Sequence, residues 1–276
     1  MTDSSRTVPL ADVKHVRIRH LQEAKRVRER FVMLTAYEQY AAEIFDQAGI
    51  DVLLVGDSAS NNVYGHKNSI PVTLDQLIPL CAAVTRSVQR PLVVADLPFG
   101  SFEVSTSQAV ESSVRLMKEG LAHAVKMEST KHFAPHVSAL TNAGIPVMAH
   151  IGFTAQREHQ LGGYRVQGRG DDAKRLMEDA LALQEAGAFC LLMEMIPEDV
   201  ATGIDAAVDI PTIGIGAGAS TTGQVLVWQD MAGLGSGKPF TFVKQYANLR
   251  EDLTKAAQAF AKEVRQGAFP TLDHTF

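Results

Sequence analysis

One pattern recurs four times along the 276-residue chain: helix-forming residues, then a glycine, then a short apolar run that ends at a polar residue. The four copies occupy residues 46–57, 118–128, 141–150 and 184–194. Their glycines can adopt the left-handed conformation that ends a helix; they are Gly49, Gly120, Gly144 and Gly187. The apolar runs are continuous rather than alternating, which is typical of parallel strands covered on both faces. The pattern therefore predicts repeated units of a helix followed by a buried parallel strand.

Further apolar runs bring the predicted strands to eight; they are residues 32–35, 91–97, 211–215 and 224–227. Helical periodicity separates the runs, in residues 37–48, 74–89, 107–119, 171–186 and 198–208. Strands that alternate with helices indicate a parallel α/β fold, and eight of them favour closure into a (β/α)8 TIM barrel over a doubly wound open sheet. Because such a barrel needs about 250 residues, we expect a single barrel domain over residues 1–276, in which residues 1–16 form a flexible N-terminal segment.

The sequence predicts further helices near both ends of the chain, in addition to those of the barrel. Residues 14–30 hold seven Lys or Arg residues against Glu23 and Glu29. Such a stretch can be an anion or membrane-surface patch, or the charged face of an amphipathic helix. We favour a helix from Leu21 onward, because the stretch has few apolar residues and no aromatic anchors. Residues 240–266 predict one long helix, or a broken pair, packed outside the barrel.

The composition limits the classes of protein to which the chain can belong. A formal charge of −5 and a sequence pI near 6.0 give no reason to expect a nucleic-acid partner. No apolar run approaches the ~18 residues of a membrane span, and the N-terminus lacks a signal-peptide pattern. Cys81 and Cys190 lack metal-ligand spacing, and we interpret them as small buried hydrophobic residues. We therefore expect a cytoplasmic protein without a membrane partner.

Polar residues stand at or just after the ends of the predicted strands. They are Thr35, Asp57 with Ser58, Asp96, Lys126 with Glu128, His150 and Glu194. In a parallel barrel the C-terminal ends of the strands meet at one mouth, where the active site lies. A carboxylate after an apolar run needs a partner, because its burial is otherwise costly. So many such residues at one rim are not explained by a structural role alone.

The chemistry of this set points to a hard cation and a keto acid. Several carboxylates without a cysteine or histidine cluster suit Mg²⁺ rather than zinc. A 2-oxo acid can chelate such an ion through its carboxylate and keto oxygen. Polarisation of the ketone acidifies the adjacent carbon, so that a base can remove its proton. We expect enolate chemistry next to a keto group.

Two further segments need an interpretation. The glycine-rich stretch 214–220 lacks the full spacing and acidic partner of a dinucleotide site, so we interpret it as tight backbone packing at a barrel turn. Residues 157–170 are longer and more polar than an ordinary connection between strand and helix. This stretch predicts a lid or a substrate loop.

Long phrases of the chain resemble the ketopantoate hydroxymethyltransferase family, also called 3-methyl-2-oxobutanoate hydroxymethyltransferase. They include MLTAY at 33–37, LLVGDS at 53–58, LVVADLPFGS at 92–101, AVKME at 124–128, AGIPVMAHIGFT at 143–154 and LGGYRVQGRG at 161–170. The resemblance runs from about residue 17 to the C-terminus. It implies a TIM barrel of the phosphoenolpyruvate/pyruvate type, assembled as a homodecamer of two pentameric rings. It also implies transfer of a one-carbon unit from 5,10-methylenetetrahydrofolate to 3-methyl-2-oxobutanoate, in pantothenate biosynthesis.

The resemblance also implies a role for each residue at the mouth. Asp57 and Asp96 would ligate Mg²⁺, and Glu128 would reach the ion through water. Ser58 and Lys126 would hold the keto acid, and Lys126 would also favour the developing negative charge. Glu194 would be the general base that takes the proton from carbon 3, with its pKa raised by burial. His150 would lie near the substrate.

The sequence departs from the family pattern at four places. Family members generally carry Asp at position 38, Gly-Gly at 129–130, Pro at 155 and Asp at 222, whereas this chain has Glu38, Ser129-Thr130, Ala155 and Thr222. None of these residues is a predicted metal ligand or the predicted base. We expect them to affect the rate or the folate affinity rather than the reaction class.

Three alternatives remain open at this point. One is a Mg²⁺-dependent lyase or aldolase that acts on another 2-oxo acid. A second uses Lys126 as a Schiff-base nucleophile without metal. A third is a non-catalytic paralogue that binds a keto acid. A requirement for the folate donor, resistance to EDTA, and proton exchange would separate them.

Overall fold

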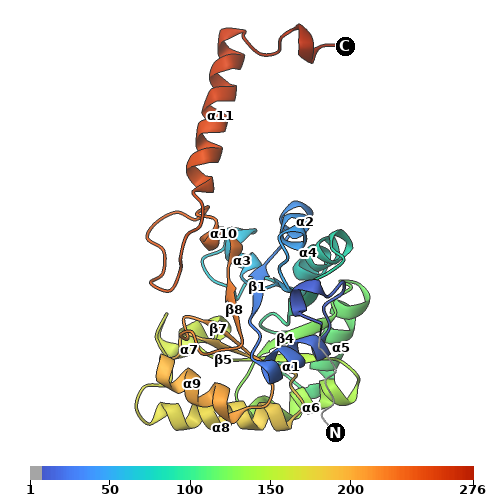
Figure 1. The fold of residues 1–276 in the computed structure, drawn as a ribbon, viewed down its shortest axis with the longest axis vertical. Helices are drawn as coiled ribbons and strands as arrows, with labels where there is room; N and C mark the ends of the chain where they lie inside the picture. Colours follow the sequence, from blue (N-terminus) through green and yellow to red (C-terminus); the bar gives the residue numbers. More distant parts are fainter. Residues whose placement is uncertain (1–7) are drawn as a thin grey trace. The chain divides into compact units, whose positions relative to one another are not determined.

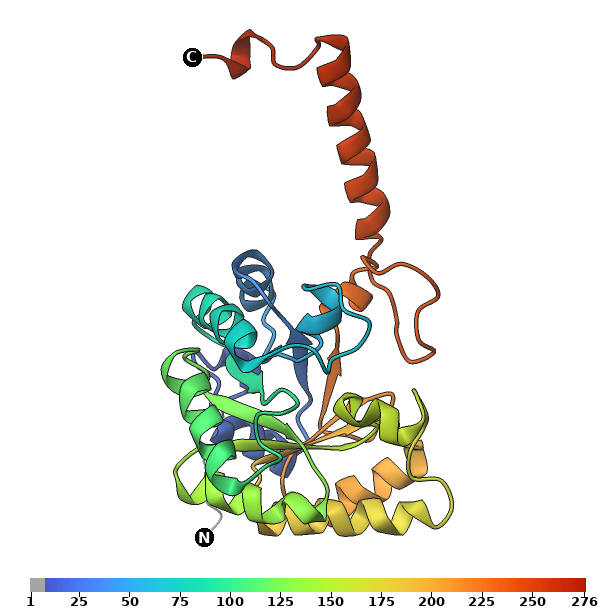
Figure 2. The same ribbon diagram turned by 180° about the vertical axis from the view of Figure 1, so that it is seen from behind.

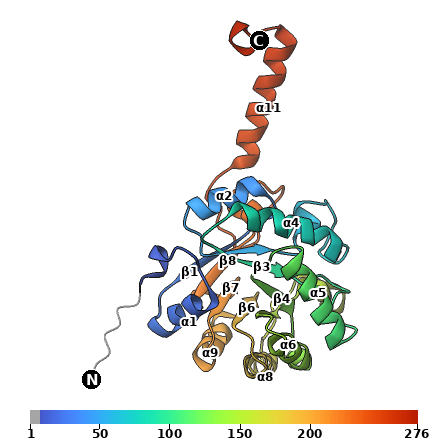
Figure 3. The same ribbon diagram turned by 90° about the vertical axis from the view of Figure 1, so that its right-hand side faces the viewer.

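The eight predicted strands pair in chain order into a closed parallel barrel (Figure 1). The computed structural model describes residues 8–276. The strands are β1 (Phe31–Thr35), β2 (Val52–Val55), β3 (Leu92–Asp96), β4 (Ala124–Glu128), β5 (Val147–Gly152), β6 (Cys190–Glu194), β7 (Thr212–Ile215) and β8 (Gly223–Leu226). Parallel pairing of β1 with β8 closes the ring, which Figure 3 shows nearly end on. The prediction of a TIM barrel is confirmed, and the open-sheet alternative is wrong.

Helices alternate with the strands and lie on the outside of the ring (Figure 2). They are α1 (Ile18–Val27), α2 (Gln39–Gln47), α3 (Ala59–Asn62), α4 (Leu74–Ser87), α5 (Thr106–Lys118), α6 (Ala134–Asn142), α7 (Glu158–Leu161), α8 (Asp172–Glu185) and α9 (Glu198–Ala207). Polar side chains fix several helix starts by accepting hydrogen bonds from free backbone N–H groups. Thr73 caps α4 and Ser105 caps α5 in this way. Within residues 8–276, no helix combines the length and the apolar composition that crossing a bilayer requires.

The barrel interior is filled by alternate residues of the strands, because successive side chains of a strand point to opposite faces. The buried apolar cluster takes its strand members from Phe31, Met33, Val52, Leu54, Leu92, Val94, Ala124, Met148, Cys190, Leu192, Ile213 and Val225. Cys190 is thus a small apolar member of this core, and Cys81 is also buried and free. Both cysteines are buried, as the sequence analysis predicted.

The N-terminal segment packs against the same core at the end where the strands begin. Leu10, Val16 and Leu21 join the buried cluster that fills the barrel. Arg90 holds the segment by donating to the Leu10 carbonyl at 2.8 Å and to Asp51 at 2.6 Å. Of the segment 1–16 that was expected to be flexible, residues 1–7 lie outside the described residues, and residues 8–16 include the buried Leu10 and Val16. This packing leaves the other end of the barrel, where the strands finish, for the polar residues.

The chain divides by its internal contacts into two compact units, and the second comprises Val227–Phe276. That unit contains α10 (Trp228–Met231) and α11 (Leu249–Gln266). A helix from residue 240 was expected, but residues 240–248 are not helical. Phe240, Phe242 and Val243 in this stretch are aromatic or β-branched residues of modest helix propensity. One barrel domain over all of 1–276 stays a prediction, since the barrel itself ends at Leu226.

Truncating Leu21, which packs α1 against the core, should destabilise the barrel. Leu21 is 0% exposed, and Leu21→Ala leaves a cavity that we expect to lower the free energy of unfolding by about 2–5 kcal/mol. Urea denaturation measures this change. Leu181→Ala on α8 is the matched control, because Leu181 is 42% exposed and should lose at most about 0.5 kcal/mol. Equal losses at the two positions would contradict the packing role of α1.

Candidate active site

Four strands deliver polar side chains to one mouth because these residues continue the inward-facing alternation of the core. Asp96 follows Leu92 and Val94 on β3 with the same parity, and Lys126 follows Ala124 on β4. The strand register then sets the neighbours. Asp96 pairs with Lys126, Glu128 pairs with His150, and Gly152 pairs with Glu194. The residues predicted from the strand ends therefore form the top layer of the barrel interior.

The loop after β2 brings Asp57 and Ser58 to the same layer. The Asp57 backbone N–H donates to Asp96 Oδ2 at 2.8 Å, and the Ser58 hydroxyl lies 2.7 Å from the Tyr37 hydroxyl. Gly56 permits this approach, since a Cβ there would lie 2.8 Å from Ser58 Oγ and 3.3 Å from Asp96 Oδ2. Tyr37 is buried, and it was not predicted as a site residue. The sequence signal that could have identified it is its position two residues after Thr35, where β1 ends.

Lys126 is the ammonium at the centre of the layer, and it is 4% exposed. Its Nζ lies 2.9 Å from Asp96 Oδ1. Burial opposes the charged form, but the carboxylates of Asp96 and Asp57 outweigh burial and raise the pKa of Lys126. A Schiff-base nucleophile must be a free amine. The raised pKa favours the ammonium form of Lys126 and so argues against the metal-free Schiff-base alternative.

His150 lies between Lys126 and Glu194. Burial, and then the Lys126 charge, hold the pKa of His150 well below its usual value, so the ring is neutral. Its Nδ1 lies 3.3 Å from Lys126 Nζ and must accept there, because an ammonium only donates. The ring proton is therefore on Nε2, which lies 3.3 Å from Glu194 Oε2.

Three carboxyl groups of the mouth, those of Asp57, Glu128 and Glu194, have raised pKa values. Burial raises the pKa of Asp57 to about 7, and the adjacent Asp96 carboxylate adds to the shift. Burial also raises the pKa of Glu128 well above its usual value, with Asp57 as the next cause. For Glu194, burial raises the pKa to about 7 although Lys126 opposes the change. Glu194 keeps 20% of its side-chain surface exposed, so it can meet a ligand in the mouth.

The donor set suits a hard cation. Asp57, Asp96, Glu128 and Glu194 face one ammonium and one neutral imidazole. Within residues 8–276, no three His, Cys, Asp or Glu side chains are arranged to hold one ion together. Mg²⁺ needs fewer, because it usually takes one or two carboxylates and completes its shell with water and substrate oxygens. The two aspartates, bridged by the bond from Asp57 N–H to Asp96, fit that requirement.

Gln156 was missed as a site residue. It lies in the short helix η3 (Ala155–Arg157) after β5, and its side-chain amide donates to Asp57 Oδ2 at 2.9 Å. Its backbone N–H donates to Glu128 Oε2 at 3.0 Å. The available signal was an uncharged polar residue shortly after a predicted strand end, which is too common to single out.

The polar segment 157–170 follows β5 and lies beside the residues of its C-terminal end. It contains α7, and the Tyr164 ring stacks on Phe153 with centroids 4.6 Å apart. Burial raises the pKa of Tyr164 to about 12, and the carboxylates of Glu158 and Glu194 add to the shift. The Tyr164 phenol thus feels the charges of the site. Lid motion of this segment stays a prediction.

The departures from the family pattern have local structural roles. Glu38 caps α2 by accepting from the N–H groups of Tyr40 and Ala41, each at 2.6 Å. Ser129 donates its hydroxyl to the Met127 carbonyl, and neither Ser129 nor Thr130 has a positive φ. No left-handed backbone therefore requires glycine at 129–130.

The glycine-rich stretch 214–220 and Thr222 also have local structural roles. In the stretch 214–220, a Cβ on Gly218 would lie 2.5 Å from Glu198 Cγ, which supports tight backbone packing there. The Thr222 N–H donates to Thr212 Oγ1 at 3.1 Å. Thr222 thus links the approach to β8 with the start of β7.

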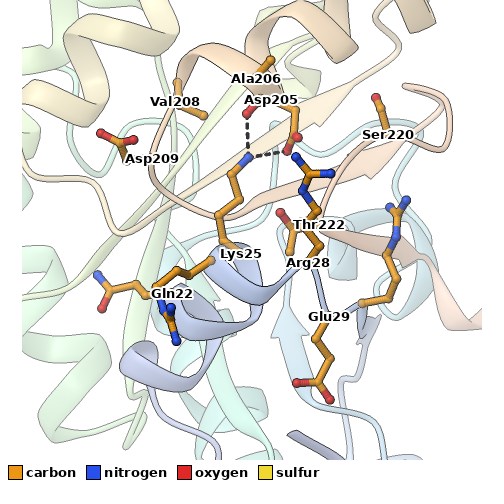
Figure 4. Close-up of a pocket in the computed structure, with 12 residues that line it drawn as sticks. Gln22, Lys25, Arg28, Glu29, Asp205, Ala206, Val208, Asp209, Ser220 and Thr222 are labelled. Carbon is orange, nitrogen blue, oxygen red and sulfur yellow. Dashed lines mark hydrogen bonds and ion pairs between the residues drawn. The ribbon is translucent and has the colours of Figure 1, made fainter. Parts of the chain in front are cut away.

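The basic residues of α1 line a cleft of about 770 Å³ at the opposite end of the barrel (Figure 4). Lys25 pairs there with Asp205 at 2.7 Å, and Arg30 donates to the Ala219 carbonyl. Such contacts suit a structural role, because active sites of this fold lie at the C-terminal end of the strands and this cleft lies at the other end. The helical interpretation of residues 14–30 fits this arrangement.

Comparison with known proteins identifies the family. A family profile described as ketopantoate hydroxymethyltransferase matches residues 15–272. The 3-methyl-2-oxobutanoate hydroxymethyltransferase of Paenarthrobacter aurescens (strain TC1) is 66% identical over 264 residues, which cover 96% of this chain and 88% of the relative. The protein of the same name from Nocardioides sp. (strain ATCC BAA-499 / JS614) is 59% identical, over 96% of this chain and 90% of the relative.

Solved structures agree on the fold. A phosphonopyruvate hydrolase in complex with oxalate and Mg²⁺ matches with a TM-score of 0.61 at 15% identity, covering 94% of this chain and 93% of that one. A 2,3-dimethylmalate lyase of the PEP mutase/isocitrate lyase superfamily matches with a TM-score of 0.58 at 18% identity, covering 98% and 92%. The structural likeness concerns the barrel alone, whereas the sequence likeness is close over nearly the full length. The chain belongs to the ketopantoate hydroxymethyltransferase family.

Proposed function

We propose that the chain transfers a hydroxymethyl group to 3-methyl-2-oxobutanoate and so forms 2-dehydropantoate for pantothenate and coenzyme A biosynthesis. Its relatives at 59–66% identity are named for this transferase. The proposed donor is 5,10-methylenetetrahydrofolate. The observation that carries the proposal is the position of Glu194: a carboxyl group with a pKa of about 7 at the barrel mouth, beside a neutral imidazole and a buried ammonium.

The proposed cation site consists of Asp57 and Asp96, with Glu128 reaching the ion through water. When bound, Mg²⁺ supplies Lewis-acid polarisation of the keto group and thereby acidifies carbon 3. A phosphonopyruvate hydrolase of the same fold has been solved with oxalate and Mg²⁺. Oxalate, like a 2-oxo acid, presents two adjacent oxygens to a cation. The likeness of that ligand to a keto acid supports the assignment of the mouth as the keto-acid site.

The remaining residues orient the substrate and carry its charge. Ser58 and Lys126 hold the keto acid in this proposal. The Lys126 ammonium is already fixed by Asp96, so it needs little reorganisation when negative charge develops on the substrate oxygen. His150, which is neutral, lies near the substrate in this proposal, with its Nε2 3.3 Å from Glu194 Oε2.

Glu194 is the proposed general base. It takes the proton from carbon 3, and the resulting enolate carbon forms the new bond to the methylene carbon of the folate donor. The two bonds from the methylene carbon to the folate nitrogens break, and water supplies the hydroxyl group of the product. The carbon 3 proton and the remaining water proton go to those nitrogens, and tetrahydrofolate leaves. A base with a pKa near 7 is well matched to a proton transfer at neutral pH.

Exchange of the carbon 3 proton tests the base without the donor. In D₂O with Mg²⁺, NMR should show deuterium entering 3-methyl-2-oxobutanoate at carbon 3. Glu194→Gln removes the proton acceptor and should slow this exchange by about 10²–10⁴-fold while the keto acid still binds. Glu185→Gln, at an exposed position on α8, is the control and should exchange at the wild-type rate. A loss of keto-acid affinity as large as the loss of rate would count against the base.

The folate donor separates this function from that of a lyase or aldolase. Turnover to 2-dehydropantoate should require 5,10-methylenetetrahydrofolate and stop with EDTA, as product analysis by mass spectrometry can show. Cleavage of another 2-oxo acid without folate would favour the lyase alternative. Keto-acid binding without any carbon 3 exchange would favour the non-catalytic paralogue.

Mg²⁺ should stabilise the protein more at pH 8 than at pH 6. The carboxyls of Asp57 and Glu194 have pKa values of about 7, raised on folding, so their contribution to stability falls as the pH rises through 7. Below pH 7 protons compete with the ion. We expect about tenfold tighter Mg²⁺ binding at pH 8, which corresponds to about 3–5 °C in Tm. Thermal scans with Mg²⁺ and with EDTA measure the difference.

Asp57→Asn is the control for this effect and should remove the Mg²⁺-dependent rise in Tm at both pH values. A rise of equal size at pH 6 and pH 8 in the wild type would show that the Asp57 carboxyl does not hold the ion. Location in the cytoplasm and assembly into a homodecamer are part of the same proposal. Sedimentation analysis would test the assembly.

A further inference from the structure

Gln156 connects three strand ends of the mouth through one residue. It is 6% exposed and lies in η3, directly after β5. Its side-chain Nε2 donates to Asp57 Oδ2 and to the Leu97 carbonyl, each at 2.9 Å. Its backbone N–H donates to Glu128 Oε2 at 3.0 Å. The loops after β2 and β3 and the end of β4 therefore all contact this residue.

The orientation of the amide follows from its partners. A carboxylate oxygen and a carbonyl oxygen both only accept hydrogen bonds, so the NH₂ group must face them and both of its hydrogens are used. The amide oxygen Oε1 then points elsewhere. It is buried and has no hydrogen-bond partner within the described part of the chain. A buried acceptor left unpaired costs about 1–3 kcal/mol, so Oε1 is suited to accept from a water or another donor that enters the site.

We propose that Gln156 is a positioning residue: its side-chain amide fixes the carboxylate of Asp57, while its backbone N–H fixes that of Glu128. This inference rests on the proposed function for its consequence, since Asp57 and Glu128 are the groups assigned there to the cation. It assigns to Gln156 a task that the strand ends cannot perform. Asp57 lies in a loop, where its side chain has no neighbouring strand to hold it.

The contacts explain why an amide is suited to this position. The side chain lies among acidic groups, where Asp96 Oδ2 is already engaged by the Asp57 N–H. A neutral donor can hold a carboxylate without cancelling its charge, so the charge remains for a cation. A lysine or arginine would neutralise that charge, and a glutamate would repel it. Outer hydrogen bonds of this kind typically change metal affinity by about 10–100-fold.

Gln156→Met tests the side chain alone, because methionine has a similar length and no donor, while the backbone bond to Glu128 persists. Titration calorimetry with Mg²⁺ as the only ligand should show about tenfold or greater weakening. Carbon 3 exchange at saturating Mg²⁺ should recover toward the wild-type rate, which places the defect in binding. Gln160→Met, at an exposed position in α7, is the control and should match the wild type.

A merely structural tether to the Leu97 carbonyl would give a different result. Gln156→Met would then lower Tm but leave the dissociation constant for Mg²⁺ at the wild-type value, and that outcome would overturn the proposal. If the methionine variant does not fold, Gln156→Asn serves instead. It keeps the amide but is one methylene too short to reach Asp57, and the same weakening is expected.

A crystal structure of Gln156→Met separates this inference from the proposed function. If the wild type shows no carbon 3 exchange, the proposed function fails, and the position of the Asp57 side chain in the variant decides the role of Gln156. An Asp57 carboxylate turned away from its wild-type position supports the role. An unmoved carboxylate overturns it.

Discussion

The arrangement of the site depends on the burial of acidic groups that one ammonium cannot neutralise. Four carboxyls, those of Asp57, Asp96, Glu128 and Glu194, share the mouth with Lys126. Burying a charge without compensation is costly, and the molecule responds with raised pKa values at Asp57, Glu128 and Glu194. The barrel keeps these carboxyl groups close together although they repel one another when they are ionised. A divalent cation would relieve the repulsion, which is why the donor set and its electrostatics point to the same ligand.

The barrel fixes the positions of these groups through the alternation of inward-facing and outward-facing residues along its strands. The inward-facing residues below the site are apolar, and the same parity continues upward to Asp96, Lys126, Glu128, His150 and Glu194. A shift of one residue in any of these strands would turn its site residue outward and an apolar neighbour inward. The hydrophobic core therefore fixes the register, and the register fixes which polar groups meet. Asp96 lies beside Lys126 because Val94 lies beside Ala124.

The sequence was sufficient for those parts of the site that follow strand periodicity. The strand ends and the order of the strands could be predicted because buried parallel strands appear as continuous apolar runs followed by a polar residue. Gln156 could not be predicted in the same way. Its partners lie 28 to 99 residues away, and its position depends on the path of the chain after β5. The helix predicted over residues 240–266 begins only at Leu249, and the reason is different: Phe240, Phe242 and Val243 are aromatic or β-branched residues, which give a helix little support.

The protonation states of the mouth also decide which residue can act as the base. Lys126 is excluded because the aspartates hold it as an ammonium. His150 is neutral, but its Nδ1 is occupied by Lys126 and its other nitrogen carries the proton, so the ring has no free lone pair for the substrate. Asp57 and Asp96 are engaged with each other and with Gln156 and Lys126, and Glu128 is held by the Gln156 backbone. Glu194 keeps 20% of its side-chain surface exposed, and its Oε2 lies 3.3 Å from His150 Nε2, so this carboxyl group can still meet a ligand and accept its proton. The assignment of the base thus follows from which groups are already committed to one another.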